Sequence, residues 1–317
     1  MVSIVCWFIF IFILFVFANE FYRKTNHYYN NYCFEKKYFK IKDYNSITNI
    51  VTGTSNALAA VASFQKNENY LILARRHQGL ITDYYLLNSV VDKAGRGTNV
   101  LLFFSPSVLL FDEKIKTNLE RNLKSIPSII VSPTALTRLK VRFPLVFDIR
   151  QIKYILFDEK RKSDFYVNKT ETISVSQAEK KAKLLTESWK KQFNINDFTM
   201  QEIYKNRQSI VDENKKYIIS MIELCKEYEL NPIIVSSPFS QKLLDILGEE
   251  FINYFNDLIT DICKEESVTY LNYIKDEDFV QSYSLFSDGC FVLNKQGSYI
   301  FMRKITKQIG RNQNEVC

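Results

Sequence analysis

The sequence predicts an α/β protein whose three-layer, doubly wound and mostly parallel sheet follows an apolar N-terminal helix. Short apolar runs alternate with longer stretches in which apolar residues recur at helical spacing. This alternation is typical of a parallel sheet with helices on both faces. Several of the runs end in Gly, Ser or Pro, as strands do where they enter a turn. A first segment almost free of polar side chains predicts the preceding helix.

The first segment, residues 2–18, reads VSIVCWFIFIFILFVFA and contains one polar side chain, Ser3. As a helix it spans about 26 Å, close to a hydrocarbon thickness of about 30 Å. It is either a single-pass membrane anchor or a signal peptide cut after Ala18, and the absence of Lys and Arg before the run favours the anchor. Basic residues follow the segment, which by the positive-inside rule favours a cytoplasmic main domain: Arg23, Lys24, Lys36, Lys37, Lys40 and Lys42.

The next part of the chain begins with a connector, residues 20–45, which is rich in Tyr and Asn. A strand then ends at Gly53, and a helix follows with Ser55 at its N-cap position. The spacing predicts three further elements: a strand over 70–74, a helix over 80–95 that ends at Gly95, and a buried strand over 99–106. Asp83 is expected to cap or charge the first turn of the second helix.

The second half contains an irregular stretch, 126–166, that predicts a helical insertion or a lid within an insertion at about 126–200. The patterns then predict amphipathic helices over 174–193 and 200–230, a strand over 231–240, helical residues over 241–268, a strand over 269–274, and a loop with a closing helix over 286–310. The predicted divisions are an anchor or signal segment (1–19), the connector (20–45), one α/β domain (46–310) and a tail (311–317).

Four turns follow strands of the predicted sheet and should line one crevice: 53–56, 75–79, 105–107 and 236–240. The carboxyl ends of parallel strands lie at the same edge of a sheet, and ligands bind outside that edge. The sequence therefore predicts a binding or active site among these turns.

Charge and cysteine usage exclude several classes of partner. The formal charge of +7 is mild, and the basic residues form no Arg-rich stripe, so we expect no nucleic-acid partner. Six cysteines without a C-x-x-C pair, together with only two histidines, predict neither a metal site nor a disulfide framework. We expect buried free thiols and no cofactor, and the oligomeric state is left open.

Three stretches occur in a characteristic order: VTGTSNAL (51–58), LILARRHQGLITDYYLL (71–87) and FSDGCFVLNKQGSYIFMRKI (286–305). With the strand and turn IIVSSPFS they resemble the blocks of the SGNH/GDSL hydrolases over roughly residues 46–310. In particular they resemble membrane-anchored members from bacterial surface-polysaccharide biosynthesis clusters. The resemblance implies a flavodoxin-like sheet, a glycan or acylated sugar as partner, and an extracytoplasmic domain, opposite to what the flanking charges favour.

The resemblance also implies roles for individual residues. Ser55 matches the nucleophile, Asp288 matches the residue that orients the catalytic base, and the N–H groups of Ser55 and Gly79 match oxyanion donors. Further side chains near these positions are candidate substrate-binding groups: Thr54, Asn56, Arg76, Gln78 and Asn294.

The chain departs from the family at the histidine of the last block. Depending on the alignment, that position is Phe291 or Val292. The only histidines are His27, in the connector, and His77, in the turn after the second strand. His77 is either a relocated base for Ser55 or a loop residue without a role, and Ser55 itself is either a nucleophile or a plain N-cap. Without a base a serine hydroxyl is a poor nucleophile.

Two functions follow from this departure. The first is O-acyl ester transfer or hydrolysis on a glycan through Ser55, with Asp288 and His77 completing the site. The alternative is a catalytically inactive SGNH-like module that binds a glycan or an assembly partner at the membrane. A glycosyltransferase, a third and less favoured class, would need a nucleotide-sugar site with an Asp-x-Asp metal pattern.

Overall fold

A computed structural model of the chain describes residues 2–25, 27–28, 44–64, 69–115, 139, 142–157 and 173–315. The chain folds into two compact units, each built from two separate segments. The first unit comprises residues 1–42 and 114–163, and the second comprises 43–113 and 164–317. The insertion expected at about 126–200 therefore contributes to both units. Most of the expected connector and the stretches 116–138 and 158–172 lie outside the described residues.

The first unit is built on the long helix α1 (Val2–Arg23). Its part Val5–Arg23 is long and apolar enough to cross a membrane, which agrees with the anchor expected at 2–18, although a signal sequence would meet the same description. Three short elements of the unit contact α1: α9 (Pro144–Phe147), the 3₁₀ turn η4 (Ile149–Ile152) and α10 (Lys153–Leu156).

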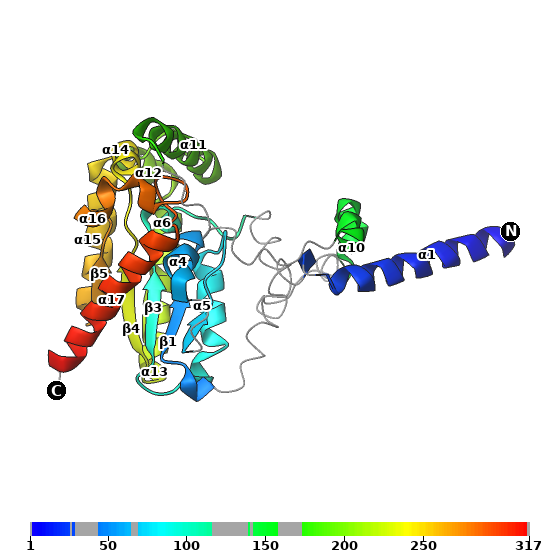
Figure 1. Ribbon diagram of the computed structural model, residues 1–317, viewed down its shortest axis with the longest axis horizontal. Helices are drawn as coiled ribbons and strands as arrows, with labels where there is room; N and C mark the ends of the chain where they lie inside the picture. The colour runs from blue at the N-terminus through cyan, green and yellow to red at the C-terminus, as the bar shows by residue number, and fades with distance from the viewer. Residues whose placement is uncertain are drawn as a thin grey trace. The chain divides into compact units, whose positions relative to one another are not determined.

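The second unit contains a five-stranded sheet in which every neighbouring pair is parallel (Figure 1). The strand order is β2-β1-β3-β4-β5, the flavodoxin-like order of doubly wound folds. The strands are β1 (Asn49–Thr52), β2 (Tyr70–Ile72), β3 (Asn99–Phe103), β4 (Asn231–Ser236) and β5 (Thr269–Asn272). This architecture confirms the predicted fold class, and each of the five strands lies within a range that its apolar run predicted.

Helices cover both faces of the sheet. On one face, Val51, Leu101 and Val235 pack with residues of α4 (Ser55–Ala60) and α17 (Lys295–Glu315) in one buried cluster. A chain that steps from β1 out to β2 and back past β1 to β3 through right-handed crossovers must place successive helices on opposite faces. The other face accordingly carries α5 (Leu80–Asn88), α13 (Gln208–Glu227) and α15 (Glu249–Glu265).

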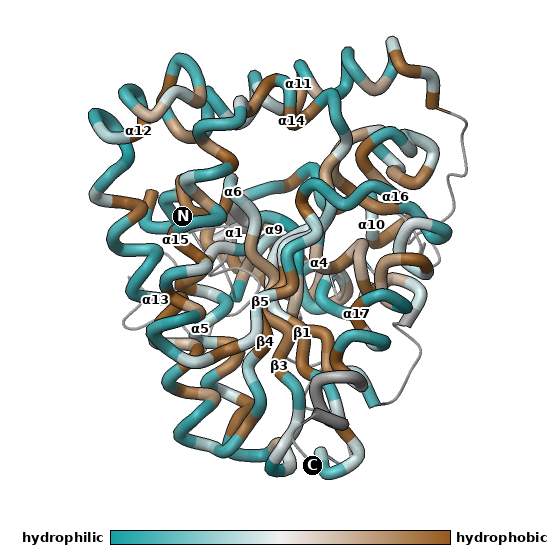
Figure 2. The backbone as a smooth tube through the Cα atoms, turned by 90° about the vertical axis from the view of Figure 1, so that its left-hand side faces the viewer, coloured by the Kyte–Doolittle hydropathy of each residue, from teal (hydrophilic) through white to brown (hydrophobic). Residues whose placement is uncertain are grey.

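The remaining helical elements of the second unit are short, except α11. They are η1 (Tyr44–Ser46), η2 (Ala62–Phe64), η3 (Val91–Lys93), α6 (Pro106–Leu109), α11 (Val175–Phe193), α12 (Met200–Asn206), α14 (Gln241–Leu247), α16 (Glu277–Val280) and η5 (Tyr283–Leu285). Figure 2 shows hydrophobic segments gathered at the strands, while α13 alternates between hydrophobic and hydrophilic along its turns, as an amphipathic helix does.

Three expected helices are shorter than the sequence pattern predicted. The helix expected over 80–95 ends at Asn88, because Val90 and Val91 turn into the core and a separate 3₁₀ turn follows. The helix expected over 200–230 breaks at Arg207, whose buried guanidinium donates to the carbonyl of Leu110 at 2.6 Å. The stretch 241–268 breaks at Gly248, where φ is +80°, a value that favours glycine.

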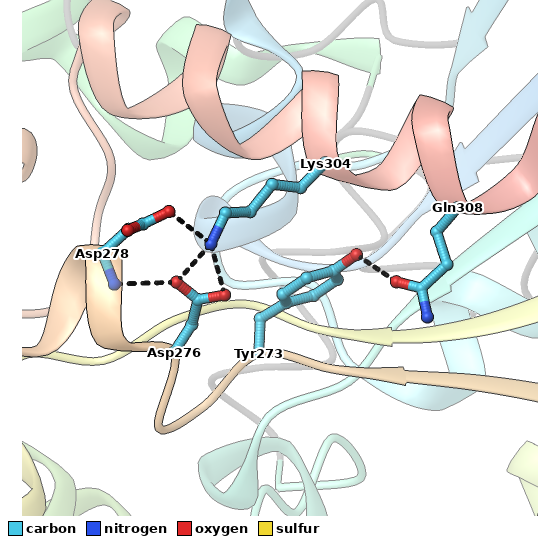
Figure 3. Close-up of polar contacts among 5 residues, drawn as sticks. All are labelled: Tyr273, Asp276, Asp278, Lys304 and Gln308. Carbon is cyan, nitrogen blue, oxygen red and sulfur yellow. Dashed lines mark hydrogen bonds and ion pairs between the residues drawn. The ribbon is translucent and has the colours of Figure 1, made fainter.

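Polar contacts fasten α17 to the turn after β5 (Figure 3). The ammonium of Lys304 lies 2.6 and 2.7 Å from the two carboxylate oxygens of Asp276 and 2.6 Å from Asp278. One turn further along the helix, the hydroxyl of Tyr273 donates to Gln308 at 2.7 Å. These contacts hold the second half of α17 beside the carboxyl end of β5. Near the N-terminus of the helix, the Ser298 hydroxyl donates to the carbonyl of Ala60 in α4 at 2.7 Å.

We expect Gly297→Ala to lower the free energy of unfolding by roughly 1–3 kcal/mol, the cost of overpacking a filled core position. A Cβ at this position would lie 2.2 Å from the carbonyl oxygen of Leu285. Gly310, in the same helix, has open space around its missing Cβ, so Gly310→Ala should gain up to about 1 kcal/mol from helix propensity. Urea unfolding of both variants measures the difference, and equal effects would contradict the close approach at residue 297.

Candidate functional site

Ser55 lies at the point where the strand order reverses. Strand β1 pairs with β2 on one side and with β3 on the other, so the connections leaving β1 and β2 diverge at their carboxyl ends. Gly53 carries the turn out of β1 with φ +128°, and a Cβ there would lie 2.8 Å from that of Ala57 and 2.9 Å from that of Phe103. A crevice at such a switch point is the usual ligand position of a doubly wound sheet.

Ser55 is the first residue of α4, and the N-cap is Thr54, so the expectation that Ser55 caps the helix is wrong. The Thr54 hydroxyl does not bond the helix N–H groups either, because it donates to Asn56 Oδ1 at 2.6 Å. The Ser55 hydroxyl makes no hydrogen bond with another described residue, and its side chain is half-buried. The first turn of α4 therefore leaves the Ser55 hydroxyl available to a ligand.

The turn after β2 lies against the Ser55 turn, since the N–H of Arg75 donates to the carbonyl of Gly53 at 3.1 Å. His77 sits two residues further on, exposed and in the left-handed backbone region at φ +57°. Arg76 is also exposed. The role of His77 as the base for Ser55, and that of Arg76 as a substrate-binding group, stay predictions.

A buried carboxyl group, that of Asp83, holds the Ser55 turn by a hydrogen bond to its backbone. Asp83 Oδ1 accepts the N–H of Gly53 at 3.0 Å and also a short hydrogen bond from Gln78 Nε2. Asp83 lies in the first turn of α5, as the sequence predicted, but its side chain is fully buried there. Gln78, expected to contact substrate, is likewise buried and donates to Asp83 and to the carbonyl of Leu73.

A second buried carboxyl, Glu113, lies in the same cluster. It accepts the N–H of Thr82 at 3.0 Å, a short hydrogen bond from the Thr82 hydroxyl, and the backbone N–H of Gly79. The predicted oxyanion donor Gly79 thus directs its N–H at a carboxylate of the protein. A Cβ built on Gly79 would lie 2.5 Å from Glu113 Oε2, so a larger residue at this position would have to displace that carboxyl group. The oxyanion role of Gly79 stays a prediction.

Burial governs the protonation of this cluster. Desolvation raises the pKa of Asp83 to about 7, although the hydrogen bonds from Gln78 and Gly53 and the charge of Arg75 oppose the rise. Desolvation also raises the pKa of Glu113, against the hydrogen bonds from Thr82 and Gly79. Two acceptor atoms of the cluster, Asp83 Oδ2 and Gln78 Oε1, have no hydrogen-bond partner among the described residues. When the Asp83 carboxyl is protonated, its oxygen Oδ2 no longer carries charge while it lacks a hydrogen-bond partner among the described residues.

The last block is organised as a closed loop. Asp288 Oδ1 accepts the backbone N–H groups of Cys290, Phe291 and Val292 at 3.0, 2.8 and 2.9 Å. The oxygen that would orient a base is therefore engaged by its own loop. Burial raises the pKa of Asp288, and burial with the nearby Asp288 charge raises the pKa of the Cys290 thiol, which therefore stays protonated.

Phe291, one of the two residues at the expected histidine position, is buried in an aromatic cluster. Its ring lies 5.2 Å from that of Trp189, on α11, and 5.4 Å from that of Phe239, in the turn after β4, both edge-on. Edge-on aromatic pairs at this separation are stabilising contacts. The place where an SGNH-type histidine is expected is thus filled by apolar packing that ties α11 to the sheet.

Asn294 is a structural residue rather than an exposed substrate-binding group. Its Oδ1 accepts the N–H of Gly297 at 3.0 Å at the start of α17, and its Nδ2 donates to the carbonyl of Ser284. The side chain is buried and caps the closing helix. The sequence pattern favours this role, because Asn is a preferred N-cap residue before a helical pattern.

Sequence reasoning missed buried polar side chains at the same edge of the sheet. Thr52 Oγ1, Asn56 Nδ2, Ser237 Oγ and Ser240 Oγ have no hydrogen-bond partner among the described residues. Each follows or ends a strand or begins a helix, and only Asn56 was singled out. The turns 53–56 and 236–240 had been expected to line a crevice, and their Ser and Asn residues were the available signal. Within the described part of the chain, no three His, Cys, Asp or Glu residues could hold a metal ion.

Comparisons with known proteins extend no further than the fold. No family model matches the sequence, and no curated protein matches it. Among solved structures, one from Bacteroides fragilis, described as a "putative acylhydrolase", superimposes with a TM-score of 0.45 at 11% identity, covering 88% of this chain and 95% of that one. A likeness at this level carries no argument about activity. The fold assignment rests on the strand pairing described above.

We expect Asp83→Asn to flatten the pH dependence of stability. A carboxyl whose pKa is raised by folding binds its proton more tightly when folded, so the protein loses stability as the pH rises from about 4 to about 7. Asparagine keeps an acceptor for the Gly53 N–H and carries no charge. The free energy of unfolding at about pH 8 should therefore rise by roughly 1–3 kcal/mol, which allows for relaxation around the buried group.

Urea unfolding of the full chain at about pH 5 and about pH 8 measures this change. Asp83→Ala is the matched control, because it removes both the charge and the acceptor of the Gly53 N–H and should lower stability at both pH values. If the unfolding free energy of Asp83→Asn changes between these pH values as much as that of the wild type, the raised pKa of Asp83 is contradicted.

Proposed function

We propose that this protein is a catalytically silent SGNH-like module held at a membrane by α1, and that it binds a glycan or an acylated sugar at the carboxyl edge of its sheet. One observation carries the proposal. The Asp288 oxygen accepts three N–H groups of its own loop, and Phe291 is packed between Trp189 and Phe239 where a base is expected. A triad lacking its histidine retains little catalysis.

The polar groups around Ser55 support a binding role. The Ser55 hydroxyl is unbonded among the described residues, and the Asn56 amide nitrogen beside it has no partner among them. Arg76 is exposed in the adjacent turn. Hydroxyl, amide and guanidinium groups form the hydrogen bonds that sugar hydroxyls and their acyl groups require. The resemblance of the sequence blocks to surface-polysaccharide proteins suggests the glycan as ligand.

A second candidate function is ester transfer or hydrolysis through Ser55 with His77 as base. The hydrogen bond from the Arg75 N–H to the Gly53 carbonyl favours it, because it holds the turn that carries His77 against the Ser55 turn. Catalytic hydrogen bonds are often formed only when substrate is bound, so the geometry without ligand leaves room for this mechanism.

Labelling with a fluorophosphonate serine-hydrolase reagent distinguishes the two functions. The full chain in detergent is treated beside Ser55→Ala, His77→Ala and an active serine hydrolase. We expect no labelling of the folded wild type, because no base activates Ser55. Labelling that disappears in both variants would assign the site to the second candidate. Glycan-array binding of the wild type that falls in Asn56→Leu, with folding unchanged by circular dichroism, would support the binding role.

We further expect that Phe291→His does not restore a reactive serine. The Asp288 oxygen stays engaged with three backbone N–H groups, and an imidazole replaces a ring in an aromatic cluster. Stability should fall by roughly 2–4 kcal/mol, from lost packing and a buried polar ring. Phe291→Leu is the control, since it removes the ring without adding a polar group. Ser55-dependent labelling of Phe291→His would mean that the histidine alone is missing from a working site.

A further inference from the structure

The C-terminal half of α1 carries a small packed cluster of its own. Tyr22, Tyr28 and Leu145 are buried there, with Phe15 and Tyr154 packed against them. The ring of His27 stacks on that of Tyr154 at a centroid distance of 3.6 Å, and its Nδ1 lies 2.9 Å from the Tyr22 hydroxyl. Residues 144–156 are therefore held against the end of the apolar helix.

Asn19 fastens this contact from within α1. Its Nδ2 donates to the carbonyl of Arg142 at 2.8 Å, and its Oδ1 accepts the N–H of Leu145 at 3.3 Å. The Asn19 side chain is fully buried, so the one amide in this part of α1 is satisfied by the backbone of the partner segment. A polar group at the edge of a bilayer needs such a partner, because hydrocarbon supplies none.

The opposite side of the bound segment is apolar and bare. Tyr154 and Ile155 pack towards α1, whereas Ile149, Ile152 and Leu156 recur at intervals of three and four and so share the other side. Leu156 is 76% exposed and Phe157, the next residue, is 73% exposed. Two basic residues, Arg150 and Lys153, flank this surface and are also exposed. Apolar side chains exposed together mark a contact surface.

We propose that residues 149–157 form a second membrane contact, lying in the bilayer interface with Ile149, Ile152, Leu156 and Phe157 among the lipids. The proposal rests on α1 crossing the membrane and goes beyond the binding role of the sheet. The argument is continuity. The bare side chains of α1, such as Phe12 and Phe17, and those of the bound segment belong to one packed unit. A bilayer that surrounds α1 therefore also contacts residues 149–157, because they belong to the segment packed against the C-terminal end of that helix.

The side chains around this surface match the chemistry of an interface. Tyr22, Tyr28 and Tyr154 lie at the end of the apolar helix, where tyrosine is enriched in membrane proteins. Lys153 can reach anionic head groups while its aliphatic stem stays with the apolar side, whereas the Arg150 guanidinium is paired with Asp148, with 2.7 Å between Nε and Oδ1. Helices with an apolar side and a basic rim lie in the plane of the interface rather than across it.

Photo-crosslinking in the full chain tests the proposal. A diazirine analogue of leucine replaces Leu156 in protein reconstituted into phosphatidylethanolamine–phosphatidylglycerol vesicles, and lipid adducts are counted by mass spectrometry. Phe12, 66% exposed on α1, is the positive control position, and Leu184, 63% exposed on α11 of the other unit, is the matched negative control. We expect lipid adducts at 156 in a yield similar to that at 12 and several-fold above that at 184.

Adducts at 156 that join only protein, from this chain or a second copy, would overturn the proposal, as would a lipid yield equal to that at 184. The same analogue at Ile149 repeats the test if the 156 variant is poorly folded. An absence of lipid adducts at 12 would remove the membrane anchor and this inference together. The fluorophosphonate and glycan results do not depend on these positions, so failure here is distinguishable from failure of the proposed function.

Discussion

The hydrogen bond from the Gly53 N–H to Asp83 is the contact on which the candidate site depends. It joins the turn after β1 to a helix that follows β2, across the point where the sheet order reverses. Gln78, in the same turn as His77, donates to the same carboxylate oxygen. The Asp83 carboxyl therefore sets both the position of the Ser55 turn and the course of the turn that carries His77. It is also the buried acid whose pKa is raised. Because that group is wholly buried, it acts on the surface site only through the two turns that it holds.

The two ends of the site have different characters. At the β1 end, a serine hydroxyl and an amide nitrogen have no hydrogen-bond partner within the part of the chain that the structure describes. At the end formed by the last block, Asp288 is enclosed by its own loop and Phe291 by two aromatic rings. Hydrogen-bonding groups without a partner among the described residues thus lie at the β1 end, where the proposed ligand would bind. At the last block, where a catalytic base would transfer a proton, the space is filled by packed side chains. This distribution is the basis of the binding role proposed above.

The sequence predicted the sheet well because the signal for a buried parallel strand is local. Each of the five apolar runs is a strand, and the turns that follow four of them were anticipated. Helix ends were predicted less well, since Arg207 interrupts a continuous helical pattern to reach a carbonyl far away in sequence. The buried roles of Asp83 and Gln78 were missed for the same reason, whereas the position of Asn294 just before a helical pattern is a local signal for its N-cap role. Nothing in the neighbouring residues shows that a polar side chain will find its partner inside the core.

The division of the chain into two interleaved units has a consequence for biosynthesis. Unit 1 uses residues 1–42 and 114–163, so the ribosome completes it before it makes β4, β5 and α17. Strand β3 can pair with β4 only after β4 has been synthesised, and the paired residues Asn99 and Asn231 are 132 positions apart in the sequence. Pairing over such a distance is slow, because the chain loses loop-closure entropy before the contacts between the strands form. Until β4 has been made, the edge of β3 that pairs with it in the finished sheet therefore has no partner strand.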